Sequence, residues 1–223
     1  MSEVKSILMV GVGGQGTILA GKILSMGLMA AGYDVKMSEV HGMAQRGGSV
    51  SNQVRFGTKV FSPIIGKGQA DILVAFEMME AMRWLEYLKP AGKVVVNDFQ
   101  IPSGPILIGK CDYPENLLDS LRERADTTVI RAGEIAAQIG NVRGMNIVLL
   151  GALVKGMSGN AVDKAMVEMI NHLGHAMQTR TIGEYAETPA IVEALRQSGV
   201  DFAQGYALAH PAPWPQQKAE AGQ

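Results

Sequence analysis

The stretch Ile7-Leu8-Met9-Val10-Gly11-Val12-Gly13-Gly14-Gln15-Gly16 begins as an apolar run and ends in closely spaced glycines. A short apolar run that stops at glycines is typical of a buried parallel strand. The residues that follow, 17–31, place leucine and isoleucine at helical spacing and end beside Gly32. The stretch therefore predicts a strand, a tight glycine turn and a helix, which together open an α/β fold.

Apolar and helical segments keep alternating as far as about residue 157. We expect further strands at 33–38, 49–56, 70–76, 93–97 and 127–131, and helices at 78–88, 115–124, 132–139 and 145–157. The segment 102–109 is bounded by proline and glycine and is expected to be an edge strand. This alternation predicts a doubly wound, mostly parallel, Rossmann-like α/β sheet with helices on both faces, followed by a C-terminal α/β extension.

Composition narrows the class of protein. Of the 223 residues, 47% are hydrophobic and 18% are charged, which is enough apolar material for a sizeable core. The net charge of −1 gives no reason to expect nucleic acid as a partner. The N-terminus lacks a signal-peptide pattern, and no charge-free apolar window of about 18 residues occurs. We therefore expect a cytoplasmic protein without a membrane span.

Candidate metal ligands are few. Cys111 is the single cysteine, so this chain alone can form neither a disulfide nor a four-thiolate iron–sulfur cluster. His172 and His175 can share one face of a helix, but no further ligand accompanies them. No metal site is therefore predicted.

The glycine turn fits the G-x-G-x-x-G pattern of dinucleotide-binding folds. In such folds the glycines allow a tight turn, and the helix N-terminus offers free N–H groups to a phosphate. An acidic residue should follow at the end of the second strand to hold a ribose, and Glu39 stands at about that place. The candidate cofactor-binding residues are Gly11, Gly13, Gly14, Gln15, Gly16 and Glu39. A free-standing dinucleotide-binding dehydrogenase and glycines that serve only close packing both remain open on this motif.

A second, unusual segment follows: Ser38-Glu39-Val40-His41-Gly42-Met43-Ala44-Gln45-Arg46-Gly47-Gly48-Ser49. A dehydrogenase has no need of a polar, glycine-rich loop at this point. Together with the glycine turn, the segment resembles the signature of the gamma domain of 2-oxoacid:ferredoxin oxidoreductases. Within that family the chain most resembles the small (beta) subunits of indolepyruvate:ferredoxin oxidoreductases, over residues 4–157.

The resemblance implies a non-catalytic subunit. A large partner subunit is expected to carry thiamine diphosphate, magnesium and 4Fe-4S clusters and to decarboxylate the oxoacid, with electrons passing to ferredoxin and the acyl group to coenzyme A. By position, His41, Gln45 and Arg46 are candidates for a loop at the partner interface or near the substrate and coenzyme A entrance. Arg46 has the geometry to pair with a carboxylate or phosphate, although it and Gln45 can equally brace the loop.

Residues 160–213 resemble a different family, the C-terminal end of EAL-type cyclic-di-GMP phosphodiesterase domains. The resemblance places Glu184, Glu187 and Gln204 at positions that belong to the active site of that family. The motifs that supply the rest of such a site are absent from this sequence, so phosphodiesterase activity is not expected. An interaction module linked to cyclic-di-GMP remains as an alternative role for this segment.

We therefore predict three regions: an oxidoreductase gamma-type domain at 1–157, an EAL-like fragment at 158–213 and a disordered tail at 214–223.

Overall fold

The computed structural model describes residues 4–41, 47–138, 140–141, 144–156, 167–168, 171, 175, 180–183 and 186–208. The chain divides into two compact units, Met1–Ile170 and Asn171–Gln223. The predicted tail at 214–223 lies outside the described residues.

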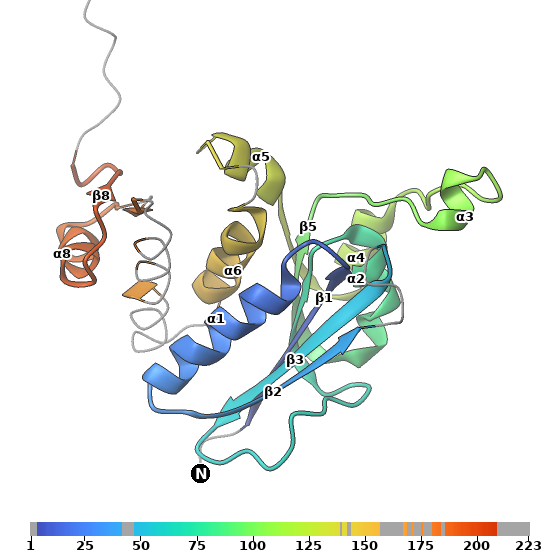
Figure 1. Ribbon diagram of the computed structural model, residues 1–223, viewed down its shortest axis with the longest axis horizontal. Helices are drawn as coiled ribbons and strands as arrows, with labels where there is room; N and C mark the ends of the chain where they lie inside the picture. Colours follow the sequence, from blue (N-terminus) through green and yellow to red (C-terminus); the bar gives the residue numbers. More distant parts are fainter. Residues whose placement is uncertain are drawn as a thin grey trace, which may run out of the picture. The chain divides into compact units, whose positions relative to one another are not determined.

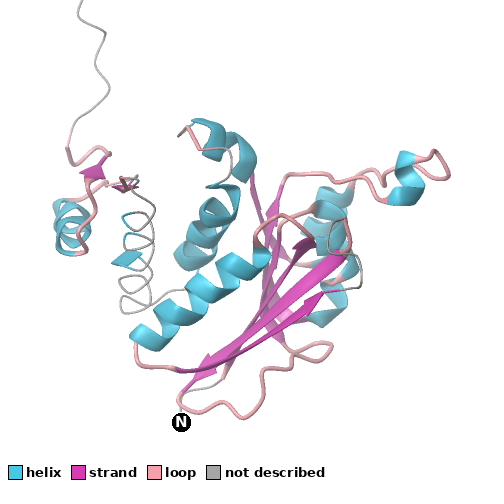
Figure 2. Ribbon diagram, viewed as in Figure 1, coloured by secondary structure: helices cyan, strands magenta, loops and turns pink. Residues whose placement is uncertain are grey.

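The first unit is built on one mixed sheet. Its strands are β1 Lys5–Val12, β2 Asp34–His41, β3 Ser49–Gly57, β4 Ala70–Ala75, β5 Leu88–Asn97 and β6 Asp126–Ile130. Their order in the sheet is β2-β3-β1-β4-β5-β6 (Figures 1 and 2). β1, β4, β5 and β6 run parallel, whereas β3 runs antiparallel to both β1 and β2. The predicted mostly parallel α/β sheet is confirmed.

Helices cover both faces of this sheet (Figure 1). They are α1 Thr17–Ala30, α2 Met78–Arg83, α4 Leu117–Arg124, α5 Ala132–Gln138 and α6 Met145–Gly156. α1 and α6 pack together on one face, with α5 against α6, and α2 and α4 pack together on the other. The sheet is therefore doubly wound, as predicted.

The apolar run of β1 lies at the centre of both layers. Ile7, Leu8, Met9 and Val10 are all at most 1% exposed. Leu8 and Val10 belong to the hydrophobic cluster with α2 and α4, and strand alternation turns Ile7 and Met9 toward α1. A strand buried on both faces needs apolar residues at every position, which is the pattern that predicted it.

One predicted element is wrong. Residues 102–109 were expected to form an edge strand, but they carry the short helix α3, Gly104–Leu107, at the end of an arm that projects from the sheet (Figure 1). Pro105 stands in the first turn of this helix, where its fixed φ is compatible with helix and its missing N–H costs nothing. The edge beside β5 is occupied instead by β6.

The second unit contains a small strand–helix–strand motif. β7 Ile182–Gly183 and β8 Phe202–Ala203 pair in parallel and are joined through α8 Pro189–Gln197. The Asp201 carboxylate accepts hydrogen bonds from the Thr181 N–H and from His175 Nε2, each at 2.8 Å. These bonds hold the pKa of Asp201 down, at about 2, with the Thr181 N–H as the largest cause.

Within the described part of the chain, no helix has the length and apolar character needed to cross a membrane.

Candidate functional site

The glycine turn after β1 takes a conformation that only glycine adopts readily. Gly14 has a φ of 103° and Gly16 a φ of 78°, both in the left-handed region. Gly16 is the N-cap of α1, and as a glycine it has no side chain with which to cap the helix. At Gly11 an added Cβ would lie 2.8 Å from Gln15 Oε1 and 3.0 Å from Phe76 Cβ. The turn therefore uses glycine both for backbone conformation and for close packing.

Gln15 holds the turn in place through both atoms of its amide. Its Oε1 accepts the Val12 N–H at 2.8 Å, and its Nε2 donates to the Phe76 carbonyl, also at 2.8 Å. The turn is thereby attached to the residue that follows β4. Gln15 thus acts as a brace, and its side chain also forms part of a pocket wall.

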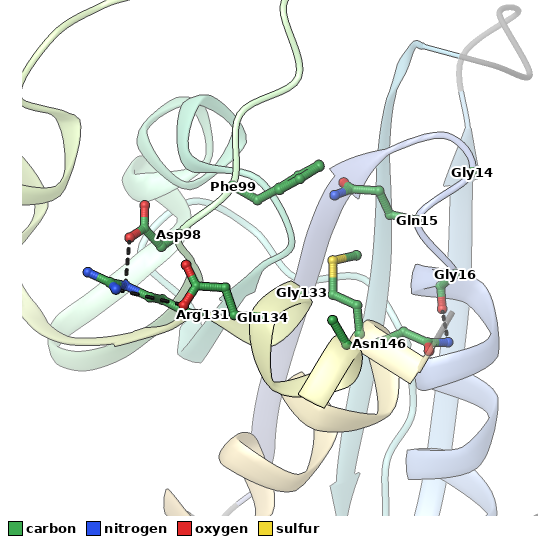
Figure 3. A pocket seen from close by; sticks show the side chains of 11 residues that line it. Gly14, Gln15, Gly16, Asp98, Phe99, Arg131, Gly133, Glu134 and Asn146 are labelled. Carbon is green, nitrogen blue, oxygen red and sulfur yellow. Dashed lines mark hydrogen bonds and ion pairs between the residues drawn. The ribbon is translucent and has the colours of Figure 1, made fainter. Parts of the chain in front are cut away.

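An open pocket of about 860 Å³ lies beside this turn, at the carboxyl ends of the parallel strands (Figure 3). Four segments line it: the glycine turn, the loop after β5, the start of α5 and the start of α6. The lining residues that carry side-chain chemistry are Gln15, Asp98, Phe99, Arg131, Glu134 and Asn146. The carboxyl edge of a doubly wound sheet is where ligands bind in open α/β folds.

The charged groups gather at one end of the pocket. Arg131 Nε lies 3.5 Å from Asp98 Oδ2, and Arg131 Nη1 lies 3.7 Å from Glu134 Oε2 (Figure 3). The Arg131 and Glu134 side chains are about two-thirds exposed, at 66% and 65%, so each ion pair contributes little to stability. Arg131 is therefore free to exchange a protein carboxylate for a ligand anion at small cost.

The opposite end is uncharged. Asn146 Nδ2 donates to the Gly16 carbonyl at 3.4 Å, and an added Cβ on Gly16 would lie 2.7 Å from that nitrogen. Phe99 and Gln15 point toward each other across the pocket (Figure 3). At this end the start of α1, where Gly16 supplies no capping side chain, lies near the aromatic ring of Phe99. Such a site suits a ligand in which an anionic group is joined to an apolar group.

Comparison with known proteins identifies the family. The model of the pyruvate ferredoxin/flavodoxin oxidoreductase family matches residues 6–180. The chain belongs to this family. The match extends past residue 157, where the resemblance seen in the sequence was expected to end.

Two curated proteins and one solved structure are similar to this chain over most of its length. The indolepyruvate oxidoreductase subunit IorB of Pyrococcus horikoshii is 39% identical over 154 residues, which cover 67% of this chain and 76% of that protein. Subunit IorB of Methanothermobacter thermautotrophicus is 40% identical over 150 residues, with 66% and 76% covered. The solved gamma subunit of a keto/oxoacid ferredoxin oxidoreductase from Geobacter sulfurreducens shares the fold, with a TM-score of 0.57, 23% identity and coverage of 88% and 92%.

A separate match concerns the resemblance of residues 160–213 to cyclic-di-GMP phosphodiesterases. The cyclic di-GMP phosphodiesterase PdeB of Shewanella oneidensis is 36% identical over 63 residues, which are 28% of this chain but 7% of that enzyme. The match supports the EAL-like character of the C-terminal segment. Because it spans so little of the enzyme, it brings no activity to this chain. Of the positions that the resemblance singled out, Glu187 and Gln204 lie among the described residues, and Glu184 does not.

The two segments that carried the resemblance in the sequence meet in the fold. The Gly13 N–H donates to the Gly48 carbonyl at 2.9 Å, which joins the glycine turn to the loop between β2 and β3. His41 is the last residue of β2, and its backbone pairs with Val50. Gln45 and Arg46 lie outside the described residues.

Glu39 lies apart from the glycine turn. It is on β2, and β3 separates that strand from β1. Its carboxylate lies 3.8 Å from Lys22 Nζ on α1. In the dinucleotide fold, the strand that carries the ribose-binding acid neighbours the first strand directly. The inserted β3 therefore weakens the dehydrogenase interpretation.

Sequence reasoning missed the far side of the pocket. Asp98, Phe99 and Arg131 follow the carboxyl ends of β5 and β6, where ligand-binding residues gather in parallel sheets. Their position directly after two predicted strands was the available signal. Among the described residues, no three His, Cys, Asp or Glu side chains converge as a metal site requires.

Proposed function

We propose that this chain is the small, non-catalytic subunit of a thiamine-diphosphate-dependent 2-oxoacid:ferredoxin oxidoreductase, and that its oxoacid is indolepyruvate or another aryl pyruvate. One observation carries the proposal: the IorB subunits are 39–40% identical to this chain over 76% of their own length. The family model, which matches residues 6–180, spans both the glycine turn and the loop that meets it at Gly48.

Under this proposal the larger partner subunit holds thiamine diphosphate, magnesium and the 4Fe-4S clusters. Cys111 is the single cysteine of this sequence, and a cluster of this type takes four thiolates, which supports cluster binding by the partner. The partner cleaves the bond between the carboxylate and the carbonyl carbon of the oxoacid and releases carbon dioxide. The electrons left by this step pass to ferredoxin, and the acyl group passes to the sulfur of coenzyme A, whose thiol proton is released. A cytoplasmic location belongs to the same proposal.

The pocket is our candidate for binding part of coenzyme A. Its volume of about 860 Å³ is in the range of small-molecule and cofactor sites, roughly 300–1,000 Å³. The N-terminus of α1, where Gly16 supplies no capping side chain, offers N–H groups to a phosphate, and Phe99, 44% exposed, offers an apolar surface to the neighbouring part of the ligand. Arg131 provides a further cation once it leaves Asp98 or Glu134.

Copurification with the large subunit tests the proposed function. Coexpression of the full chain with the large oxidoreductase subunit of the same organism should give a brown, iron-containing complex. That complex should reduce ferredoxin when both indolepyruvate and coenzyme A are added. Failure to copurify, together with tight binding of NAD or FAD by the isolated chain, would instead support the free-standing dehydrogenase.

A further inference from the structure

The turn directly after β4, Phe76 to Met78, connects the separate walls of the pocket. The Phe76 carbonyl accepts hydrogen bonds from Gln15 Nε2 at 2.8 Å and from Asn97 Nδ2 at 3.3 Å. Asn97 Oδ1 in turn accepts the Ala132 N–H at 3.0 Å, at the start of α5. The Phe76 carbonyl thereby joins the glycine turn to the end of β5, and Asn97 extends this connection to the start of α5.

The same turn also fixes the loop that carries Phe99. The Met78 N–H donates to the Phe99 carbonyl at 3.1 Å. Two residues further along that loop, the Ile101 N–H donates to Glu77 Oε1 at 3.3 Å. The aromatic wall of the pocket is therefore attached to the start of α2 on both sides of Gln100.

Glu77 is the unusual member of this turn because its carboxylate is fully buried, with 0% of the residue exposed. Glu77 Oε2 accepts the Glu80 N–H at 2.8 Å and caps α2, while Oε1 accepts Ile101 N–H and the Tyr113 hydroxyl. Burying a carboxylate is costly unless such bonds compensate for lost water. Capping alone needs no glutamate, since Ser, Thr, Asp or Asn caps a helix at least as well. The extra length and second oxygen of Glu77 serve Ile101 and Tyr113.

Ile101 and Tyr113 lie at the base of the arm that carries α3, one where the chain enters the arm and the other where it returns. The arm begins just after Phe99 and ends in two strongly exposed apolar side chains, Leu107 at 72% and Ile108 at 67%. The Tyr113 hydroxyl is half-buried beside the Glu77 carboxylate, and burial, followed by the hydrogen bond to Glu77, raises its pKa above the usual value. One buried carboxylate thus fixes where the arm leaves the domain.

We propose that Glu77 is a positioning residue for the coenzyme A pocket: it touches no ligand itself, but it holds the Phe99 wall and the base of the arm in the geometry that binds. This inference rests on the proposed function of the pocket. It assigns Glu77 an effect on ligand affinity rather than on the chemistry, because the reacting groups are on the partner subunit.

Kinetics of the reconstituted complex test the proposal. Glu77→Gln keeps the shape of the side chain but replaces one acceptor oxygen by a donor NH2, so either the α2 cap or the bonds to the arm are lost. We expect this variant to raise KM for coenzyme A about tenfold, as loss of a hydrogen bond to a charged group does. Values of kcat and of KM for the oxoacid should stay within about twofold of the wild type.

Tyr113→Phe is the milder variant, because it removes one bond to Glu77 and leaves the α2 cap intact. It should raise KM for coenzyme A about threefold, and it keeps the proposal testable if Glu77→Gln does not fold. Tyr33→Phe is the matched control: its ring packs edge-on against Phe56, away from the pocket, and KM should not change. A lowered Tm with KM for coenzyme A unchanged in both Glu77→Gln and Tyr113→Phe would overturn the proposal.

Amide exchange separates this inference from the proposed function. If the wild-type complex turns over without any dependence on coenzyme A, the assignment of the pocket fails. The positioning role is then decided by hydrogen–deuterium exchange of the full chain. Glu77→Gln should speed exchange in residues 11–16 and 98–102 relative to the wild type, and unchanged exchange in both segments would overturn the role of Glu77.

Discussion

Gly21 on α1 packs closely against Asn52 on β3, and this contact allows a quantitative test of the fold. An added Cβ on Gly21 would lie 1.9 Å from Asn52 Nδ2 and 2.7 Å from its Cγ. Asn52 is 1% exposed, and neither of its amide atoms has a hydrogen-bond partner among the described residues. We therefore expect Gly21→Ala and Asn52→Ala to be strongly coupled.

The magnitude follows from two opposing effects. Alanine in a helix interior is about 1 kcal/mol more favourable than glycine, whereas overpacking costs roughly 1–3 kcal/mol. Gly21→Ala alone should therefore lower the free energy of unfolding by about 1 kcal/mol. In the Asn52→Ala background the clash is absent, so the same substitution should raise the free energy of unfolding by about 1 kcal/mol. The coupling between the two sites is then about 2 kcal/mol.

Urea unfolding measures this coupling. Trp84 packs against the core of the first unit, and Trp214→Phe leaves it as the single tryptophan, so fluorescence then reports on that unit. Gly151→Ala in α6 is the matched control, since no described atom beyond the neighbouring backbone of α6 lies within 4 Å of its added Cβ. This substitution should gain only the higher helix propensity of alanine. Effects of Gly21→Ala that agree to within about 0.5 kcal/mol in the two backgrounds would refute the packing that we describe.

Three further predictions concern the site and the second unit. Gly16→Ala should lower the free energy of unfolding by about 2 kcal/mol or more, because a φ of 78° strains alanine and the added Cβ meets Asn146. Gly32→Ala has a similar φ of 88°, but no described atom lies within 4 Å of the added Cβ, so it should lower the free energy of unfolding by less in the same urea assay. Phe99→Ala should weaken coenzyme A binding about tenfold in calorimetry, or about 1.4 kcal/mol, whereas Phe61→Ala, which removes an aromatic ring that is 86% exposed outside the pocket, should leave binding unchanged. Asp201 should stabilise the second unit at neutral pH, because its pKa is lowered on folding. This stabilisation should disappear as the pH falls from about 4 toward 2, which the amide resonance of Thr181 would report. Asp201→Asn should remove that pH dependence.

Local patterns predicted the elements of the fold well. The run from Ile7 to Val10 is apolar at every position because β1 is covered on both faces. The burial of this strand could therefore be predicted from its own residues. α1 likewise begins directly after the glycine turn and ends at Ala30, two residues before Gly32, where a helix-ending glycine was expected. In both cases neighbouring residues determine the outcome.

These local sequence patterns could not predict the order of the strands in the sheet. β3 inserts between β1 and β2, and this pairing depends on residues far apart in the chain. No two-residue hairpin signal joins β2 to β3, so the sequence offered no local sign of their antiparallel pairing. The distance of Glu39 from the glycine turn is a direct consequence.

The pocket was only half predictable for the same reason. The glycine turn lies within one continuous stretch, so its residues could be named from the sequence. Asp98, Phe99 and Arg131 come from the ends of two other strands, and they meet only because β5 and β6 are neighbours in the sheet. Glu77 showed no local signal at all, since its role depends on Ile101 and Tyr113 across the projecting arm.

Oxoacid-dependent ferredoxin reduction by the large subunit, assayed with and without this chain, decides whether the chain is a working subunit of the oxidoreductase. We predict that the complex of the two subunits reduces ferredoxin when indolepyruvate and coenzyme A are both present, and that the large subunit without this chain loses most of that activity. Equal activity of the large subunit with and without this chain, together with no stable complex between them, would contradict the account.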